Sequence, residues 1–176
     1  MFKARLLPVL SLLLVIALPG TAGGQEVVRR DGEPEVRMFQ SGDPDMVAAF
    51  DAARSSVSGL VQRLPKLQAA EIYASVKVPV VEGDQVEHIW LNDVRFDRGQ
   101  VHGALGNAPL NLPSWSYGDP ISVPLERISD WMVVYQDRLI GGYTLFVARN
   151  RLQGEALESF DRQVGLIFPD RPQSFD

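Results

Sequence analysis

Short runs of alternating apolar and polar residues, separated by turn-forming residues, occupy the chain from residue 72 to 148 and constrain its fold most strongly. The first run carries apolar side chains at every second position, which is typical of one face of a β-strand: Ile72, Ala74, Val76, Val78 and Val80. Further strands are predicted over residues 86–91 with an extension at 94–96, then 100–105, 121–125, 131–135 and 142–148. Short strands joined by tight turns favour an antiparallel sheet of six or seven strands. Glycines such as Gly99 and Gly103 would allow this sheet to bend or to close part of the way into a barrel.

Two helices are predicted to cover the sheet, over residues 44–64 and 151–164. Asp43 is suited to cap the first helix and Pro44 to its first helical position. Apolar residues then recur at helical spacing until Pro65, which is expected to end the helix. Gly165 is a natural stop for the second helix. The predicted fold class is therefore α+β, with a bent antiparallel sheet packed by two helices.

The amino terminus has the pattern of a secretory signal peptide over residues 1–22. Lys3 and Arg5 precede an apolar run that Pro19 and Gly20 interrupt, and small residues follow. The alternative is a retained membrane anchor, but the run has only about 13 residues, whereas a spanning helix needs about 20. Cleavage is expected after Ala22, or else after Gly24. We therefore expect an exported protein, periplasmic or secreted, that is soluble once the leader is removed.

Composition narrows the classes of protein to which the chain could belong. The 176 residues include no cysteine, which excludes disulfide scaffolds, lipid-anchored lipoproteins, thiol enzymes and cysteine zinc sites. A formal charge of −5 argues against a nucleic-acid partner. No cofactor is predicted, and no membrane contact after cleavage. Behind the leader we expect a flexible lead-in over residues 23–42, one domain over 43–168 and a polar tail over 169–176.

Five short motifs follow one another in order along the predicted domain. They are Glu87-His88-Ile89-Trp90-Leu91, the run from Gly103 to Pro109, Gly118-Asp119, Ile128-Ser129-Asp130-Trp131-Met132 and Gly141-Gly142-Tyr143-Thr144. Together they resemble the bacterial YegJ-like family, known as domain of unknown function 2314, over residues 43–168. This resemblance implies where the domain begins and ends. It implies no reaction, ligand or catalytic residue.

The two histidines offer little scope for a catalytic or metal site. Glu87 and His88 are adjacent on a predicted strand, so their side chains should point to opposite faces and His88 should be packed or hydrogen-bonded. A turn centred on Arg98-Gly99 would place His102 opposite Arg95. His88 would then lie roughly 23 Å from His102 at about 3.3 Å per strand residue. A shared metal ion is therefore not expected, because both nitrogens would have to approach it to about 2 Å.

Asp119 and Asp130 are the remaining candidates for catalysis, and each immediately precedes or opens a predicted strand. A short carboxylate in such a position commonly accepts hydrogen bonds from turn amides. Alternatively, the two could form a carboxylate pair that divides acid and base roles beside Trp115 and Trp131. The sequence favours the turn interpretation and leaves the pair open.

Trp115 is the strongest candidate for a ligand contact, since it lies in a long proline-bearing loop over residues 107–118. Asn107 and Trp131 complete the candidate ligand-binding set, although Asn107 also suits turn geometry. The leading hypothesis is a non-catalytic exported module that binds a protein, a peptide or a small ligand of the cell envelope. The alternative is a small periplasmic hydrolase or isomerase that uses Asp119 and Asp130 with His88. A third interpretation is a structural or immunity-type partner of one dedicated protein.

Overall fold

The computed structural model describes residues 14–15, 26–28, 36–39 and 42–175. The predicted signal peptide, apart from Leu14–Val15, and both predicted cleavage positions lie outside the described residues. None of the helices in the described part of the chain combines the length and the hydropathy that a membrane span needs.

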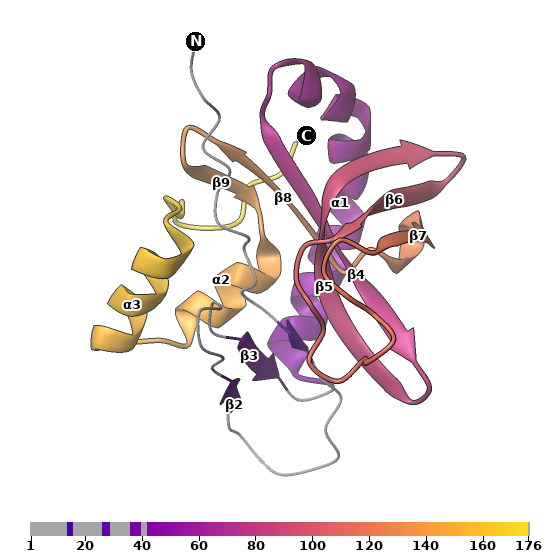
Figure 1. The fold of residues 1–176 in the computed structure, drawn as a ribbon. Helices are drawn as coiled ribbons and strands as arrows, with labels where there is room; N and C mark the ends of the chain where they lie inside the picture. Colours follow the sequence, from indigo (N-terminus) through magenta and orange to yellow (C-terminus); the bar gives the residue numbers. More distant parts are fainter. Residues whose placement is uncertain (1–13, 16–25, 29–35, 40–41, 176) are drawn as a thin grey trace.

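A six-stranded antiparallel sheet forms the centre of the molecule (Figure 1). Its strands are β4 (Tyr73–Glu82), β5 (Gln85–Asp97), β6 (Gln100–Leu105), β7 (Pro120–Pro124), β8 (Asp130–Tyr135) and β9 (Arg138–Gly141). The spatial order is β7-β6-β5-β4-β8-β9, and neighbouring strands are antiparallel throughout. Arg95 pairs with His102 in the register expected from the Arg98-Gly99 turn. The predicted α+β class is confirmed, and the sheet remains open because β7 and β9 form its two edges.

In the described part of the chain, three α-helices accompany the sheet: α1 (Pro44–Ala69), α2 (Tyr143–Asn150) and α3 (Gly154–Val164). The predicted cap of α1 is confirmed, since the carboxylate of Asp43 accepts hydrogen bonds from the backbone N–H of Asp45 and Met46, each at 3.1 Å. The prediction that Pro65 ends this helix is wrong. Leu64 and Leu67 both pack into the core and hold the final turn in place, which offsets the backbone hydrogen bond that the proline cannot donate.

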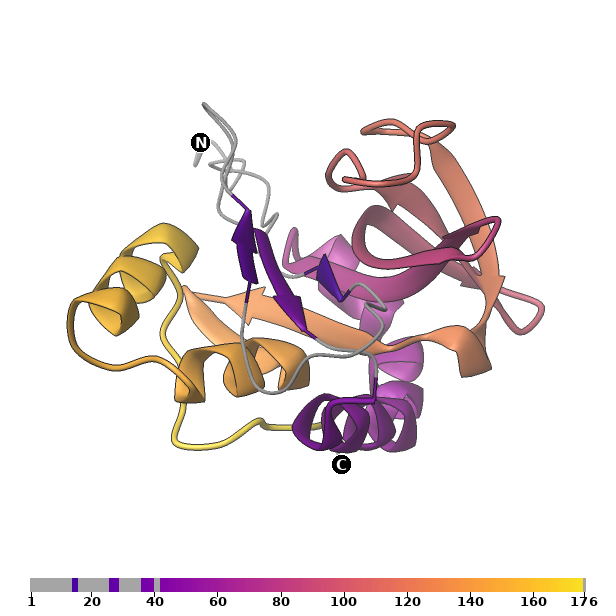
Figure 2. The ribbon, with the colours of Figure 1, turned by 90° about the horizontal axis from the view of Figure 1, so that it is seen from below.

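The strand predicted over residues 142–148 is instead the helix α2, which the two-helix prediction lacked. Gly141 and Gly142 have φ values of 73° and 69°, and these left-handed conformations turn the chain out of β9 and into a helix. The helix buries Leu145, Phe146 and Ala148. Figure 2 shows α1 and α2 side by side, with α3 farther out.

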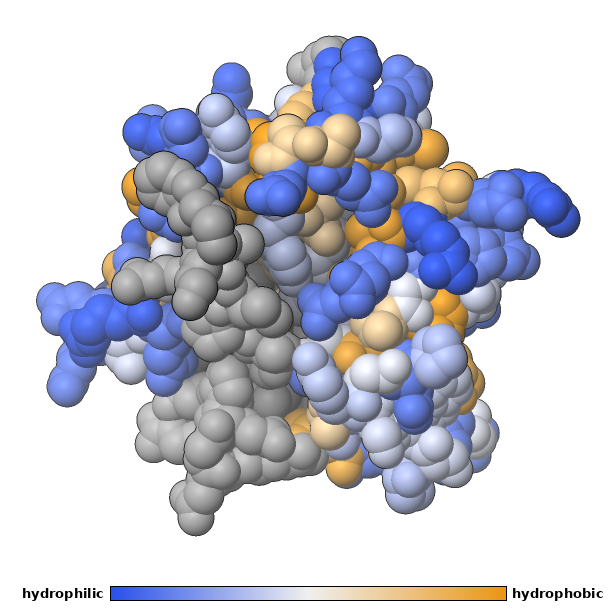
Figure 3. Space-filling model, turned by 45° about the horizontal axis from the view of Figure 1, so that its top comes forward, coloured by the Kyte–Doolittle hydropathy of each residue, from blue (hydrophilic) through white to orange (hydrophobic). Residues whose placement is uncertain are grey.

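Both faces of the central strands are covered. Successive residues of β8 alternate between two apolar clusters: Met132 and Val134 pack with residues of α2 and α3, whereas Trp131 and Val133 pack with residues of α1. In the middle of β4 and along most of β8, side chains on both faces are therefore in the interior. On the face of the molecule shown in Figure 3, hydrophilic and apolar side chains are interspersed.

A second, small sheet precedes the domain, in the order β1-β3-β2. Its strands are β1 (Leu14–Val15), β2 (Glu26–Val28) and β3 (Val36–Phe39), and β1 lies near β5. The predicted lead-in over residues 23–42 thus contains two short strands, which its lack of periodicity did not indicate. Its predicted flexibility stays a prediction.

The two edges of the large sheet differ. The edge strand β7 begins at Pro120 and ends at Pro124. The other edge, β9, is bordered by residues 166–175, a segment that we name the strap. The N–H of Leu139 donates to the carbonyl of Ile167 at 3.0 Å, and the N–H of Gly141 donates to the carbonyl of Gln173 at 2.8 Å. The predicted polar tail over residues 169–176 therefore includes residues that pack on the domain.

Candidate functional site

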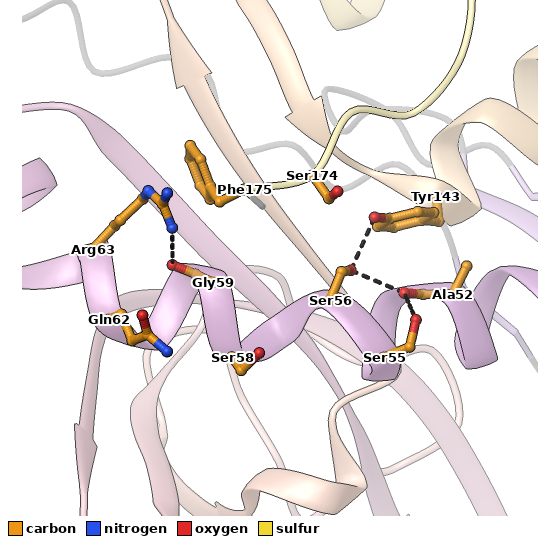
Figure 4. A pocket seen from close by; sticks show the side chains of 10 residues that line it. All are labelled: Ala52, Ser55, Ser56, Ser58, Gly59, Gln62, Arg63, Tyr143, Ser174 and Phe175. Atoms are coloured by element: carbon orange, nitrogen blue, oxygen red, sulfur yellow. Dashed lines mark hydrogen bonds between the residues drawn. The ribbon is translucent and has the colours of Figure 1, made fainter.

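A groove of about 550 Å³ lies between α1 and the end of the strap (Figure 4). Hydroxyl groups dominate its polar lining, together with one amide and one guanidinium. The polar lining residues are Ser55, Ser56, Ser58, Gln62, Arg63, Tyr143 and Ser174, and the rest are Ala52, Gly59 and Phe175. Hydroxyls both donate and accept hydrogen bonds, so this lining can satisfy a ligand that presents both kinds of group, as a peptide backbone does.

The groove follows from the spacing of small residues on α1. Ala52, Ser55 and Gly59 recur at intervals of three or four and therefore lie along one side of the helix. In Figure 4 the Ser56 side chain points toward Tyr143, and the two hydroxyl oxygens are 2.9 Å apart. Behind them, the indole N–H of Trp131 donates to the Ser56 hydroxyl at 3.0 Å. The buried Trp131 ring thus supports lining residues of the groove from behind.

The strap closes one end of the groove through Phe175. Its ring stacks on Trp131 with a centroid separation of 5.6 Å and an interplanar angle of 18°. The Arg63 guanidinium lies 5.0 Å from the centroid of the Phe175 ring, within the range of a cation–π contact. Gly59 makes room for this approach, because a Cβ at that position would lie 2.3 Å from the carbonyl oxygen of Phe175.

A second hollow of about 480 Å³ lies on the other side of Tyr143. Its lining includes Asp45, Asn150, Arg151 and Pro172. Arg151 forms a salt bridge to Asp43 with an N–O distance of 2.7 Å and another to Asp45. Hydrogen bonds to these two carboxylates hold the pKa of Arg151 above its usual value. The charge of Arg151 is therefore already compensated at the start of α1.

Lys77, Thr144 and Asp130 form a fully buried polar cluster between β4, β8 and α2. The Lys77 Nζ donates to the Thr144 hydroxyl at 2.9 Å, and that hydroxyl donates to the Asp130 carboxylate at 2.6 Å. Asp130 also accepts hydrogen bonds from the backbone N–H of Trp131 at 2.7 Å and of Thr144 at 2.8 Å. Burial lowers the pKa of Lys77 to about 8 and raises the pKa of Asp130. The carboxylate therefore ties the start of β8 to the start of α2.

His88 lies near this cluster but is not hydrogen-bonded to it. Its ring stacks on Phe50 with centroids 4.9 Å apart, and its buried Nδ1 makes no hydrogen bond within the described part of the chain. Burial, followed by the charge of Lys77, lowers the pKa of His88 to about 3. A histidine that is neutral down to this pH is poorly matched to proton transfer near pH 7. As expected for adjacent strand residues, Glu87 faces elsewhere and accepts a hydrogen bond from the Leu110 N–H at 2.8 Å.

The structure does not bring Asp119 and Asp130 together. Asp119 accepts a hydrogen bond from the Ser116 N–H at 2.7 Å, which is the turn geometry that the sequence favours. It precedes β7, whereas Asp130 opens β8, and β6, β5 and β4 lie between these two strands. Four strand spacings of about 4.8 Å separate the two strands by roughly 19 Å. Carboxyl groups that cooperate across one bond are within about 10 Å of each other.

The three ligand-binding candidates are also not assembled into one site. Trp115 is half-buried and packs against the core cluster that contains Trp131. The Asn107 side chain donates to the neighbouring carbonyl of Ala108 at 3.2 Å. Trp131 contacts two residues that line the groove, Ser56 and Phe175, but is not itself part of the lining.

Sequence reasoning did not identify the residues that line the groove or the buried cluster. Ser55, Ser58 and Gln62 are visible in the sequence as the polar side of a helix, but only the packing of the strap makes them part of a groove. Lys77 lies between Val76 and Val78 on a predicted strand, so its side chain was expected on the face opposite to the valines. The sequence did not indicate that this second face is also buried. No group of three or more histidine, aspartate or glutamate side chains among the described residues is placed to hold a metal ion.

Comparison with known proteins places the chain in a family. The model of a family described as "Uncharacterized protein conserved in bacteria (DUF2314)" matches residues 43–168. A protein of Neisseria meningitidis serogroup B, named as a putative ankyrin repeat protein, is 34% identical over 150 residues, which cover 81% of this chain and 59% of that protein. The Escherichia coli protein named uncharacterized protein YegJ is 33% identical over 108 residues, which cover 60% of this chain and 69% of YegJ. No solved structure matches the chain. The chain belongs to the YegJ-like DUF2314 family of bacterial proteins.

Proposed function

We propose that this chain is a non-catalytic binding domain that holds an extended peptide segment of a protein partner in the groove beside α1. The observation that carries the proposal is the lining of that groove: five hydroxyls, an amide and a guanidinium around a volume of about 550 Å³. A peptide backbone presents one donor and one acceptor per residue, and hydroxyl groups can match both.

The titratable groups support a binding role, because their hydrogen bonds and contacts hold the fold together. Asp119 fixes a turn, Asp130 accepts hydrogen bonds from the backbone at the start of α2, and Glu87 holds the loop at Leu110. His88 is stacked on Phe50 and is neutral over the physiological pH range. None of these groups lines the groove.

The proposed location of this binding domain is the cell envelope. The basic residues, apolar run and small-residue exit of residues 1–22 support export to the periplasm or beyond. A domain exported to the periplasm or beyond would encounter other exported proteins, whose extended segments are the proposed ligands.

The test is a selection of displayed random peptides on the purified protein. Ser58 is an exposed residue of the groove, so Ser58→Trp should fill it without disturbing the core. Lys66→Trp places the same side chain at an exposed position of α1 outside the groove and serves as the matched control. Selected peptides should bind the Ser58→Trp protein at least about tenfold more weakly than the wild type, with no such loss for Lys66→Trp. Failure to enrich any peptide, or equal binding by both variants and the wild type, would contradict the proposal.

A further inference from the structure

We infer that the strap is an intramolecular ligand of the groove, and that the partner is an extended peptide that displaces it by inserting an aromatic side chain in place of Phe175. This inference rests on the proposed function and names the chemistry of the segment that the groove takes.

The first observation is that the strap lies along β9 in the way that a bound peptide adds to a sheet edge. All three hydrogen bonds join backbone groups. The Ile167 carbonyl accepts from the Leu139 N–H at 3.0 Å, and the Ile167 N–H donates to the Asp137 carbonyl at 2.7 Å. The Gln173 carbonyl accepts from the Gly141 N–H at 2.8 Å. Arg138 forms a parallel bridge with Ile167. In this mode of recognition, main-chain hydrogen bonds supply affinity for any extended segment, and side-chain pockets supply specificity.

The second observation is a built slot for one aromatic ring. Trp131 provides a stacking surface 5.6 Å away, Arg63 lies over the ring at 5.0 Å, and Gly59 provides the space beneath the backbone. A Cβ on residue 59 would approach the Phe175 carbonyl oxygen to 2.3 Å and its Cβ to 2.9 Å. Trp131 and Gly59 belong to the sheet and to α1, so the slot does not depend on the strap for its shape.

The third observation concerns the burial of the strap beyond Phe168. From Pro169 to Ser174 its residues are exposed or only half-buried, whereas the next residue, Phe175, packs against an apolar cluster. Phe168 itself stays anchored against Phe146, with ring centroids 5.2 Å apart. Release of residues 169–175 would therefore open the slot and the end of the groove while the preceding core contact is kept.

The ligand class follows from these contacts: an extended peptide whose aromatic side chain enters the slot between Trp131 and Arg63. A segment tethered to the same chain competes for the slot at an effective concentration of about millimolar. The strap therefore occupies the slot until a partner peptide with higher affinity displaces it. The affinity of a free peptide is reduced in proportion to the fraction of chains whose slot is open.

The test uses a fluorescein-labelled peptide with the sequence of residues 169–175, Pro-Asp-Arg-Pro-Gln-Ser-Phe, and fluorescence anisotropy. The Phe175→Ala protein should bind this peptide at least about tenfold more tightly than the wild type, because the competing ring has been removed. The same peptide with its phenylalanine replaced by alanine should not bind. Adding Gly59→Ala to Phe175→Ala should abolish binding, since the new Cβ occupies the space that the peptide backbone needs.

Equal peptide binding by the folded Phe175→Ala protein and the wild type, or no binding by either, would overturn the inference. If Phe175→Ala no longer unfolds cooperatively, Phe175→Leu keeps an apolar anchor and permits the same comparison. An affinity for the labelled peptide that is at least about threefold higher for Phe175→Leu than for the wild type supports the inference that the strap occupies the slot. An unchanged affinity overturns it. Selected library peptides that bind the wild type and Phe175→Ala equally well would refute the strap alone, whereas an empty selection on both would refute the proposed function.

Discussion

The amine of Lys77 is held in the interior of the sheet, and this placement predicts that the protein becomes more stable as the pH rises above about 8. Burial lowers the pKa of Lys77 from 10.5 to about 8. Between these values the unfolded chain binds a proton that the native chain does not, so the free energy of unfolding increases with pH. The increase is at most about 1.4 kcal/mol per pH unit. Over the whole interval it amounts to about 3 kcal/mol.

The perturbation is Lys77→Met, which fills the same space without the titrating group. Urea unfolding at pH 7, 8, 9 and 10 gives the free energy of unfolding of each protein. The stability of the wild type minus that of Lys77→Met should rise by about 1 kcal/mol per unit between pH 8 and 10. Loss of the ammonium also removes a charge that lowers the pKa of Asp130, so the variant loses stability as the pH rises through the pKa of that carboxyl.

The matched control is Lys66→Met, which removes an exposed lysine of α1. Its stability should change with pH in parallel with that of the wild type. Parallel profiles of the wild type and Lys77→Met between pH 8 and 10 would refute the reasoning, because they would mean that the amine holds its proton equally well in the folded and unfolded chains.

Two further predictions concern the predicted site residues and their partners. Thr144→Val removes the hydroxyl that links Lys77 to Asp130 and should lower the free energy of unfolding by about 2–3 kcal/mol. Thr144→Ser keeps a hydroxyl, so its free energy of unfolding should stay within about 1 kcal/mol of the wild type. Urea unfolding at pH 7 measures both variants. Asp119→Ala loses one hydrogen bond in an exposed turn and should cost only about 1 kcal/mol in the same assay, with peptide binding unchanged; a loss of peptide binding would instead indicate that Asp119 belongs to the site.

The sheet and the start of α1 could be predicted from the sequence because their signals are local. Alternation of apolar residues identified β4 to β8 but not β9, and the turn at Arg98-Gly99 predicted the pairing of Arg95 with His102. The cap at Asp43 needs only the three residues that follow it, and the structure has that cap.

The helix α2 was missed because its composition resembles a strand. Tyr143, Thr144 and Val147 all favour strands, but the left-handed glycines before them redirect the chain and α2 then packs on the core. Packing against α1 and the sheet decides the outcome, and a single sequence does not show it. The burial of Lys77 has the same origin: alternation assigns a residue to a face, and only the second layer shows that this face is also covered.

The groove depends on contacts between distant parts of the chain. Ser56 meets Tyr143 from a position 87 residues earlier in the chain, and Phe175 reaches Gly59 from the last part of the described chain. The polar composition of residues 169–176 concealed the one aromatic residue that packs. The predicted site residues, by contrast, drew attention because of their chemistry. In the structure, Asp119 and Asp130 stabilise a turn and a strand end, whereas His88, Trp115 and Trp131 pack against other side chains.

The coverage of β9 by the strap has a consequence for self-association. The opposite edge, β7, carries a proline at each end, and proline cannot donate the hydrogen bond that a neighbouring strand would need. Uncovering β9 would therefore expose the edge at which a second molecule could add a strand. A ligand that filled the aromatic slot without lying along β9 would leave the Gly141 end of this edge uncovered, since the Gln173 carbonyl would no longer accept its hydrogen bond, and a second molecule could pair there.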